Sequence, residues 1–469
     1  MIGSKLIEVV TVLSSKEKKG VEDYLEETLL PSKLRAFELW KYIVNLKVFD
    51  ENSLNKEKIF SILFPDESFD TLKLRRVRSY LLKAIEDYLW LEQSRQSVYT
   101  KNLWLNHWYR KHKANKSFDY TNRVLNQHLE KSNYRDGQHY FQRFLKENEQ
   151  YQYEETQKRT APKNLQDLSD TLEIAFVLEK LKQCCTLIAH KAVYQTEYNT
   201  GLLLPILEAI EKGKYAHIPA IQVYYLIYKA LEYPKENDYF LDFKTLLEQH
   251  LSIFRKEEQR TLFLLGINYC IKKINTGNQD FKMVLFELYK EGLEQTILLE
   301  NGVVTRWTYI NVIALGLGLK KFEWVEQFIN AYKNNLEASH REDTYNFNLA
   351  KLYYTQKTYD KAMKLLLDVK FQDTFLQLNA RMLLLKIYFE LNESKVLMAY
   401  LNSFEVFLRR QKSVTYHKTS YLNLVSISKR IVTLNTYDKA AREKLKERII
   451  NTKVLPERDW LLGLVSNWQ

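Results

Sequence analysis

The stretch DTYNFNLAKLYYTQKTYDKAMKLLLDV, residues 343–369, contains two apolar-periodic segments on either side of the polar break Gln356–Tyr359. Apolar residues spaced three and four apart share one face of an α-helix, and a short break makes consecutive helices antiparallel neighbours. Ala350 and Ala362 provide a small residue on each helix, which lets the two backbones cross closely. The stretch therefore predicts a closely packed helical hairpin.

The same pattern continues on both sides of this hairpin. Its defining positions are Leu349, Ala350, Tyr353, Tyr359, Ala362 and Leu366. A shift of 37 residues toward the N-terminus gives Val312, Ile313, Gly316, Phe322, Val325 and Ile329. A shift of 35 residues toward the C-terminus gives Leu384, Leu385, Tyr388, Ser394, Leu397 and Leu401. The apolar character largely persists in both neighbours, whereas the small residues do not.

The residues of 343–369 resemble the tetratricopeptide repeat, whose period is about 34 residues. The neighbouring hairpins resemble it only in their apolar pattern, over roughly residues 215–410. The resemblance implies an array of stacked hairpins whose concave groove holds a peptide or a protein. Val325 and Leu397 occupy positions where the family favours Ala, so we expect wider helix crossings there.

Composition predicts the same fold class for the whole chain. Its 469 residues include only 12 Gly and 7 Pro, well below the average usage of roughly 7% and 5%. Tight β-hairpins consume these residues, whereas long helices joined by short polar loops do not. A chain of this length exceeds what one hydrophobic core fills, and a repeating array packs each unit only on its neighbours. We therefore predict an all-α protein built as an α-solenoid of antiparallel hairpins.

Three segments are expected along the chain. Residues 1–94 form a small N-terminal helical module, residues 95–455 form the hairpin solenoid, clearest at 303–410, and residues 456–469 form a C-terminal capping helix. Within the module, helices are expected near 4–13, 15–29, 32–47, 54–64 and 69–94. The capping helix places Trp460, Leu464 and Trp468 on one face, which would cover the last exposed hairpin. The alternative for this helix is a docking peptide for another molecule.

No motif for catalysis, cofactor binding or metal binding is evident. Gly316 and Gly318 begin a G-x-G run, but Lys321 occupies the third glycine position and no strand is expected before it. Cys184, Cys185 and Cys270 cannot form a disulfide framework, and the first two are best interpreted as small core residues of a helix. No apolar run approaches the roughly 18 residues of a membrane span. We expect a non-enzymatic, cytoplasmic protein without cofactor, metal or membrane contact.

The net charge of +12 is concentrated near the C-terminus. Between residues 406 and 453 twelve basic residues face three acidic ones. Our candidates for partner contacts in this region are Arg409, Arg410, Lys412, Lys418, Lys429 and Arg430. Such a surface favours an acidic partner.

A second basic block, residues 93–118, contains no acidic residue and carries two tryptophans, Trp104 and Trp108. Cations interleaved with aromatic rings grip phosphates while bases stack on the rings, which is one interpretation. The other is that the two tryptophans, four residues apart, form the buried stripe of a helix and the charges its solvated face. We favour the buried stripe because core packing explains the spacing without a ligand.

The helices expected at 54–64 and 69–94 also suggest a helix-turn-helix, whose second helix would begin with Lys73, Arg75, Arg76 and Arg78. Arg76 and Lys83, however, project away from the apolar stripe, as solvated residues do. Candidate nucleic-acid contacts across the chain are Arg75, Arg76, Arg110, Lys111 and Lys113.

Two functional hypotheses follow from these patterns. The favoured one is a non-enzymatic scaffold or adaptor that binds a protein or peptide through its helical surface, with the basic C-terminal region favouring acidic partners. The alternative is a nucleic-acid-associated regulator whose basic faces at 95–116 and 409–453 follow the phosphate backbone.

Overall fold

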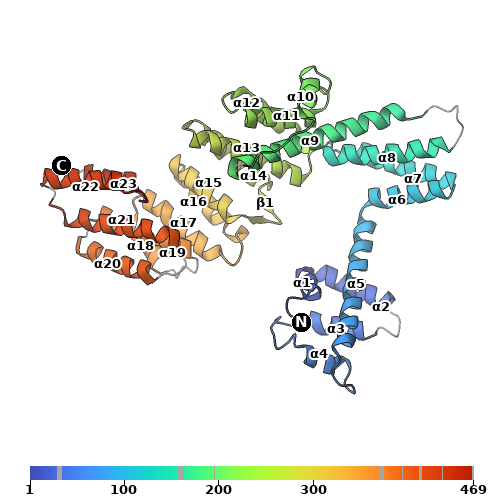
Figure 1. Ribbon diagram of the computed structural model, residues 1–469, viewed down its shortest axis with the longest axis horizontal. Coiled ribbons are helices and arrows are strands. Elements are labelled where there is room, and N and C mark those ends of the chain that lie inside the picture. The colour runs from blue at the N-terminus through green and yellow to red at the C-terminus, as the bar shows by residue number, and fades with distance from the viewer. Residues whose placement is uncertain are drawn as a thin grey trace. The chain divides into compact units, whose positions relative to one another are not determined.

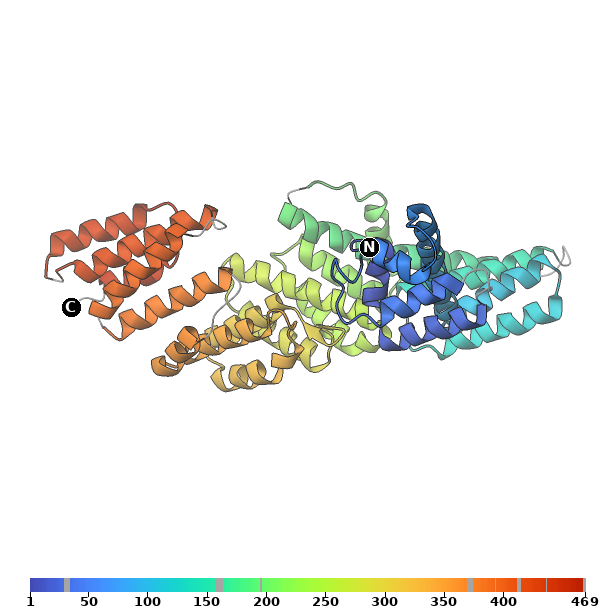
Figure 2. The same cartoon turned by 90° about the horizontal axis from the view of Figure 1, so that it is seen from below.

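The computed structural model describes residues 1–28, 34–156, 163–194, 196–368, 374–392, 394–410, 415–435 and 437–466. Within these ranges the regular secondary structure is α-helical, apart from two short 3-10 helices and one pair of two-residue strands. This confirms the predicted all-α class. Figure 1 and Figure 2 show the helices from two directions. The chain divides into two compact units, Met1–Lys180 and Leu181–Gln469, and the long helix α9 (Leu165–Tyr194) contributes to both. No helix in the described ranges is long and apolar enough to cross a bilayer.

The first part of unit 1 is a helical module that packs around one long helix. Its helices are α1 (Lys5–Val12), α2 (Ser15–Thr28), α3 (Leu34–Val44), α4 (Lys56–Leu63) and α5 (Thr71–Gln96), close to the predicted positions. All four shorter helices contact α5, and Trp40 is completely buried among them. Asp70 begins α5 by accepting hydrogen bonds from the backbone N–H groups of Leu72 and Lys73, at 2.7 and 3.1 Å. The fully buried residues of α5 end at Ile85, Tyr88 and Leu89 pack partly buried against the same core, and only the last two turns extend beyond it.

The rest of unit 1 consists of α6 (Val98–Lys111), α7 (Asn115–Lys131), α8 (Gly137–Glu155) and the first half of α9. Helices α6 and α7 form a hairpin, and α8 contacts both. Phe118 of α7 stacks on Tyr153 of α8 with ring centroids 3.9 Å apart. A buried hydrogen bond of 2.8 Å from the Thr121 hydroxyl to the Asn106 side-chain oxygen joins α7 to α6.

Unit 2 continues after α9 as a run of shorter helices, many of which pack against their neighbour along the chain. They are α10 (Leu203–Glu211), α11 (Pro219–Glu232), α12 (Asp238–His250), α13 (Lys256–Asn275), α14 (Phe281–Glu294), α15 (Arg306–Gly318), α16 (Phe322–Ala331), α17 (Arg341–Thr355), α18 (Tyr359–Asp368), α19 (Thr374–Glu390), α20 (Ser394–Arg410), α21 (Thr415–Thr433), α22 (Lys439–Asn451) and α23 (Arg458–Ser466). From α13 to α21 each helix packs against the next helix along the chain. Contacts also occur between α11 and α13, between α15 and α17, and between α17 and α19. At three steps, α11–α13, α15–α17 and α17–α19, a helix therefore also contacts the helix two places further along the chain.

The turns after α15, α17 and α19 share a residue with left-handed backbone geometry. Lys320, Lys357 and Asn392 follow the ends of α15, α17 and α19 and adopt left-handed φ angles of 58°, 60° and 54°. In the first two turns the N–H group after this residue donates to a carbonyl five residues earlier, from Lys321 to Gly316 and from Thr358 to Tyr353, both at 2.9 Å. This arrangement satisfies carbonyl groups at the helix end, and the next helix starts after three intervening residues.

Close helix crossings occur in the expected hairpin and in its N-terminal neighbour, but with different residues. In the α17–α18 hairpin, Ala350 and Ala362 are both completely buried. In the α15–α16 hairpin, Val325 is completely buried and Gly316 faces it: a Cβ atom added to Gly316 would lie 2.5 Å from Val325 Cγ2. One small residue on the first helix, Gly316, therefore takes the place of the two alanines, and the backbone of α15 still approaches α16 closely.

A short β-hairpin separates α14 from α15 and was missed in the sequence. Strands β1 (Leu299–Glu300) and β2 (Val303–Val304) pair antiparallel, with Leu299 opposite Val304. Asn301 and Gly302 form the turn with φ angles of 52° and 79°. Asn-Gly favours this left-handed two-residue turn, so the sequence did contain the signal.

The C-terminal helices pack into the same hydrophobic cluster as α17–α21. Leu461 and Val465 of α23 are completely buried, and the Trp460 ring packs edge-on against Phe389 of α19 at 5.3 Å between centroids. Just before α23, the Glu457 carboxylate pairs with Lys386 of α19 at 2.7 Å. Helix α23 therefore covers part of α19, while Trp468, which we expected on the same face, lies outside the described residues.

Candidate partner-binding site

An apolar cleft lies where α5 meets α6 in unit 1. It has a volume of about 500 Å³ and is lined by Trp90, Leu91, Ser94, Thr100, Lys101, Trp104 and Leu105. Trp90 on α5 is 65% exposed and Trp104 on α6 is 63% exposed. Ser97 sets the bend between the helices because it ends α5 and caps α6, accepting a hydrogen bond from the Thr100 N–H group at 3.1 Å. Figure 1 shows α5 leading from the N-terminal module into α6 at this point.

The favoured sequence interpretation of Trp104 and Trp108 as a buried stripe is wrong. Trp108 is 42% exposed, and the buried residues of α6 are Tyr99 and Asn106. The Tyr99 hydroxyl donates to the Gln142 carbonyl oxygen at 2.7 Å, and Asn106 is held by the hydrogen bond from Thr121. A polar residue thus occupies a core position of α6, where its side-chain oxygen accepts from Thr121 on α7, and the tryptophans face outward.

One cation of the basic block on α6 is used inside unit 1. Arg110 Nε donates to Glu149 of α8 at 2.7 Å, and both side chains are mostly buried. His107 Nδ1 lies 2.9 Å from the other oxygen of the same carboxylate. Arg110 therefore serves to attach α6 to α8. Lys111 and Lys113, by contrast, are exposed and have no ion pair among the described residues.

The structure brings together part of the basic C-terminal set around an acidic residue. Glu405 of α20 accepts from Arg409 and from Lys429 of α21, each at 2.6 Å. The hydrogen bond from Lys429, followed by that from Arg409, lowers the pKa of Glu405. Lys418 Nζ donates to the Arg409 carbonyl oxygen at 2.9 Å. Glu405 lies one residue before the stretch that we counted as basic, which is why the sequence analysis missed it.

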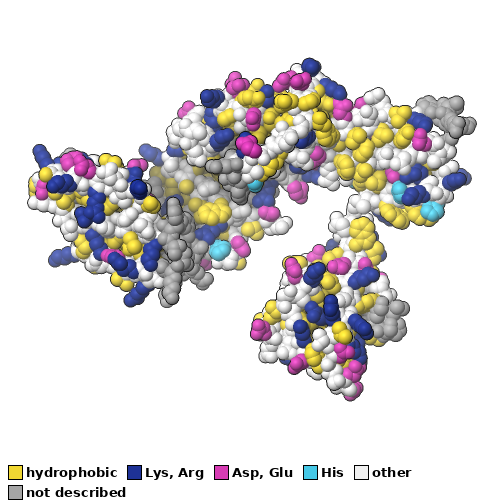
Figure 3. Space-filling view, in the orientation of Figure 1, with side chains coloured by type: hydrophobic (Ala, Val, Ile, Leu, Met, Phe, Trp, Pro, Cys, Tyr) yellow, Lys and Arg dark blue, Asp and Glu magenta, His cyan; other side chains and the backbone are white. Residues whose placement is uncertain are grey.

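The remaining candidates are not gathered into one block. Arg410 and Arg430 are exposed on α20 and α21, and Lys412 lies outside the described residues. On the face seen in Figure 3, Lys and Arg side chains are spread over the C-terminal helices with acidic side chains among them. Arg75 and Arg76 are both exposed at the start of α5, and only Arg75 lines a cavity.

The three cysteines are core residues, as expected for Cys184 and Cys185. All three side chains are buried and none of them is in a disulfide within the described residues, and burial raises the pKa of Cys270 to about 12. The described residues contain no group of three or more His, Cys, Asp or Glu side chains arranged to hold a metal ion.

Comparison of the chain with models of protein families, with curated proteins and with solved structures found no match. Its function has therefore to be inferred from its own surfaces. Among the surfaces described, the α5–α6 cleft combines a defined hollow with two large aromatic side chains that the fold leaves in solvent.

Proposed function

We propose that this chain is a non-enzymatic scaffold that binds a protein partner, and that the α5–α6 cleft receives an apolar segment of that partner. The observation that supports this most strongly is the pair of exposed tryptophans, Trp90 on α5 and Trp104 on α6, that both line one largely apolar cleft. Tryptophan is enriched among the residues that dominate binding energy at protein interfaces. Exposed apolar clefts of this kind mark interaction sites on soluble proteins.

The two exposed rings of the cleft can contribute a substantial part of the energy of binding a partner. A tryptophan side chain buries roughly 150–250 Å² when it is fully covered, so each of these has about 100 Å² left to bury. At roughly 25 cal/mol per Å², the two rings together contribute about 5 kcal/mol before the entropy lost on association is subtracted. Removal of both rings should therefore abolish a complex of micromolar affinity.

Charge near the cleft specifies the kind of segment that fits. Lys101 is part of the lining, and Arg95 is exposed in the last turn of α5. Residues 93–118 contain no acidic side chain, and Glu92, just before them on α5, accepts a hydrogen bond from Gln96 at 2.9 Å. The partner segment should therefore carry acidic residues beside its apolar anchor, because such rim charges steer association and suppress wrong partners.

The hairpins of unit 2 supply the body of the scaffold. We propose that α11–α20 form a tetratricopeptide-like solenoid, supported by the contacts between first helices of successive pairs and by the recurring left-handed turn. Such arrays present extended surfaces to protein ligands. The cleft of unit 1 and the helices of unit 2 would then hold different parts of one assembly or two different partners.

The experiment compares two variants of the full-length protein in quantitative pulldowns from the native cell. The test variant carries Trp90→Ala and Trp104→Ala, and the matched control carries Trp307→Ala on α15, where the ring is also 63% exposed. We expect a protein recovered in stoichiometric amount with the wild type and the control to be lost from the test variant. Recovery of the same proteins by all three forms would refute the proposed site, and recovery of nucleic acid alone would refute the scaffold function.

A second candidate function, nucleic-acid binding, is favoured by one specific observation. Exposed Trp104 lies on the same helix as the exposed cations Lys101 and Lys111, with Lys113 just beyond its end. Bases stack on exposed rings while neighbouring cations contact phosphates. Binding to single-stranded and duplex oligonucleotides should then weaken steeply as salt rises, and Lys111→Glu with Lys113→Glu should reduce it. Absence of binding at low salt would exclude this candidate.

A further inference from the structure

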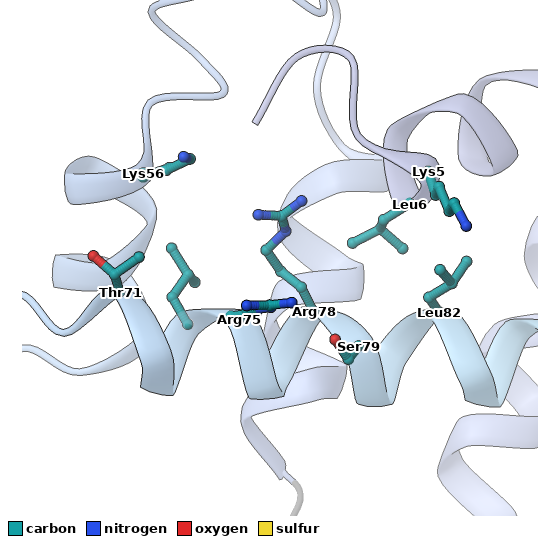
Figure 4. A pocket seen from close by; sticks show the side chains of 9 residues that line it. Lys5, Leu6, Lys56, Thr71, Arg75, Arg78, Ser79 and Leu82 are labelled. Atoms are coloured by element: carbon teal, nitrogen blue, oxygen red, sulfur yellow. The ribbon is translucent and has the colours of Figure 1, made fainter.

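A second cavity, separate from the α5–α6 cleft, lies inside the N-terminal module between α1, α4 and α5. It has a volume of about 320 Å³. Its lining residues are Lys5, Leu6, Lys56, Thr71, Leu74, Arg75, Arg78, Ser79 and Leu82. We call it the basic cavity, because four of these nine residues are Lys or Arg and none is acidic. Figure 4 shows Lys56 extending from α4 and Arg78 rising from α5 toward the same space, with Arg75 lying along α5 beside Arg78.

The four cations are not neutralised by the protein. Lys5, Lys56, Arg75 and Arg78 have no ion-pair or hydrogen-bond partner among the described residues, and Arg78 Nε is buried without one. Of the three acidic residues in the loop before α5, Glu67 pairs with Lys73 and Asp70 caps the helix, while Asp66 is exposed and makes no ion pair with these cations. Burial lowers the pKa of Arg78, and the neighbouring Arg75 lowers it further. The folded module therefore holds a cluster of like charges in close proximity.

We infer that the basic cavity binds a small molecule that carries at least two phosphate groups. Guanidinium groups form paired hydrogen bonds with phosphate oxygens, and lysine ammonium groups add point charges, so the set of four suits a highly charged anion. Thr71 and Ser79 add hydroxyl donors on α5. The volume of about 320 Å³ far exceeds the roughly 30 Å³ that one water molecule occupies, which leaves room for more than one phosphate. Leu6 and Leu82 provide apolar contact for the rest of the molecule.

A duplex backbone fits these observations less well than a small ligand. The cations lie in a recess between three helices, whereas a protein that follows a duplex spreads its cations along an open surface. The module is also close to neutral overall, with 15 Lys and Arg and 16 Asp and Glu in residues 1–94. A local recess of positive charge in a neutral module selects a compact anion rather than a long polyanion.

The test is calorimetric titration of the full-length protein with inorganic pyrophosphate at low salt, with inorganic phosphate and a single-stranded oligonucleotide as separate arms. We expect pyrophosphate to bind with a dissociation constant below about 1 mM. Lys56→Gln with Arg78→Gln should weaken binding by about tenfold or more, since each cation makes charge-assisted hydrogen bonds. The matched control, Lys58→Gln with Arg76→Gln, changes exposed cations of the same two helices that do not line the cavity and should bind as the wild type does.

A second test variant, Lys5→Gln with Lys56→Gln, changes only exposed side chains and keeps the question answerable if Arg78 proves necessary for folding. It should also weaken pyrophosphate binding, while circular dichroism reports unchanged helix content. The inference is overturned by absence of pyrophosphate binding, by equal affinity in wild type and both test variants, or by equal loss in the matched control. Oligonucleotide binding without pyrophosphate binding would also overturn it.

Discussion

Replacement of Gly316 by Ala should destabilise the α15–α16 hairpin, because the added methyl group has no space. Its Cβ atom would lie 2.5 Å from Val325 Cγ2 and 3.5 Å from a ring carbon of Phe286. Two carbon atoms normally approach to about 3.5–4.0 Å, so the first contact is short by at least 1 Å. Val325 is completely buried and its branched side chain is restricted at χ1, so it cannot rotate away cheaply. The helices must separate or the side chain must leave its preferred rotamer.

The expected magnitude follows from two opposing effects. Insertion of a methyl group into a packed core costs about 1–3 kcal/mol, whereas Gly to Ala in a helix gains about 1 kcal/mol in helix propensity. The net loss should be about 1 kcal/mol. Val325→Ala alone removes two buried methyl groups and should cost about 2 kcal/mol. In the double variant the new methyl group of residue 316 occupies part of the space that Val325 leaves, so the losses should not add and the coupling energy should be about 1 kcal/mol.

Hydrogen–deuterium exchange of peptides from α15 and α16 measures the loss of local stability in this hairpin. Each 1.4 kcal/mol of lost local stability increases the exchange rate about tenfold. Gly318→Ala is the matched control, because a Cβ atom there meets no other atom within 4 Å. It should exchange no faster than the wild type. Equal tolerance of alanine at residues 316 and 318, or simple addition of the Gly316 and Val325 effects, would refute the packing argument.

Three further predictions concern single side chains in unit 2. Tyr309→Phe removes the buried hydrogen bond of 3.0 Å to the Ile329 carbonyl oxygen and should lower the free energy of unfolding by about 1–2 kcal/mol in urea titrations; an unchanged midpoint would contradict it. Tyr269→Phe should be neutral or stabilising at pH 7, because the buried hydroxyl has no hydrogen-bond partner among the described residues. Burial raises the pKa of Tyr269 from 10 to about 12, so the hydroxyl loses its proton at lower pH in the unfolded state than in the folded state. The free energy of unfolding should therefore fall between pH 10 and 12, and it should fall less in Tyr269→Phe than in the wild type. Lys357→Gly should stabilise the protein by about 0.5 kcal/mol and so raise its melting temperature, because glycine adopts the left-handed φ without strain. The control, Lys361→Gly inside α18, should lower the melting temperature.

The positions of the helices followed closely from the sequence, because polar breaks have a local cause. The expected break Gln356–Tyr359, for example, coincides with the end of α17 at Thr355 and the start of α18 at Tyr359. Short-range hydrogen bonds and the left-handed turn residue fix such an end, and no distant contact is needed. The α14–α15 connection was the main omission, although Asn301-Gly302 carries the turn signal in the sequence itself.

The candidate site was harder to predict, because spacing does not say which face of a helix is buried. On α6, Trp104 and Trp108 are four residues apart, but Tyr99, Leu103 and Asn106 follow spacings of four and three equally well. The second set is the one that packs inward, and it does so through hydrogen bonds to Gln142 and Thr121, which are 43 and 15 residues away. Residues that far along the chain cannot be paired by inspection of one helix.

The hairpins around 343–369 keep the geometry of their turns better than the identity of their crossing residues. The left-handed residues Lys320, Lys357 and Asn392 are spaced by 37 and 35 residues, the same shifts that align the apolar pattern. At the crossings, by contrast, the Ala350–Ala362 pair of α17–α18 corresponds to Ile313 and Val325 in the preceding hairpin, α15–α16. There Gly316 provides the space instead. A crossing needs a small total volume at the contact, and either helix can provide it. Position-by-position comparison therefore underestimates the likeness of such hairpins, and comparison of summed volume at each crossing would detect it.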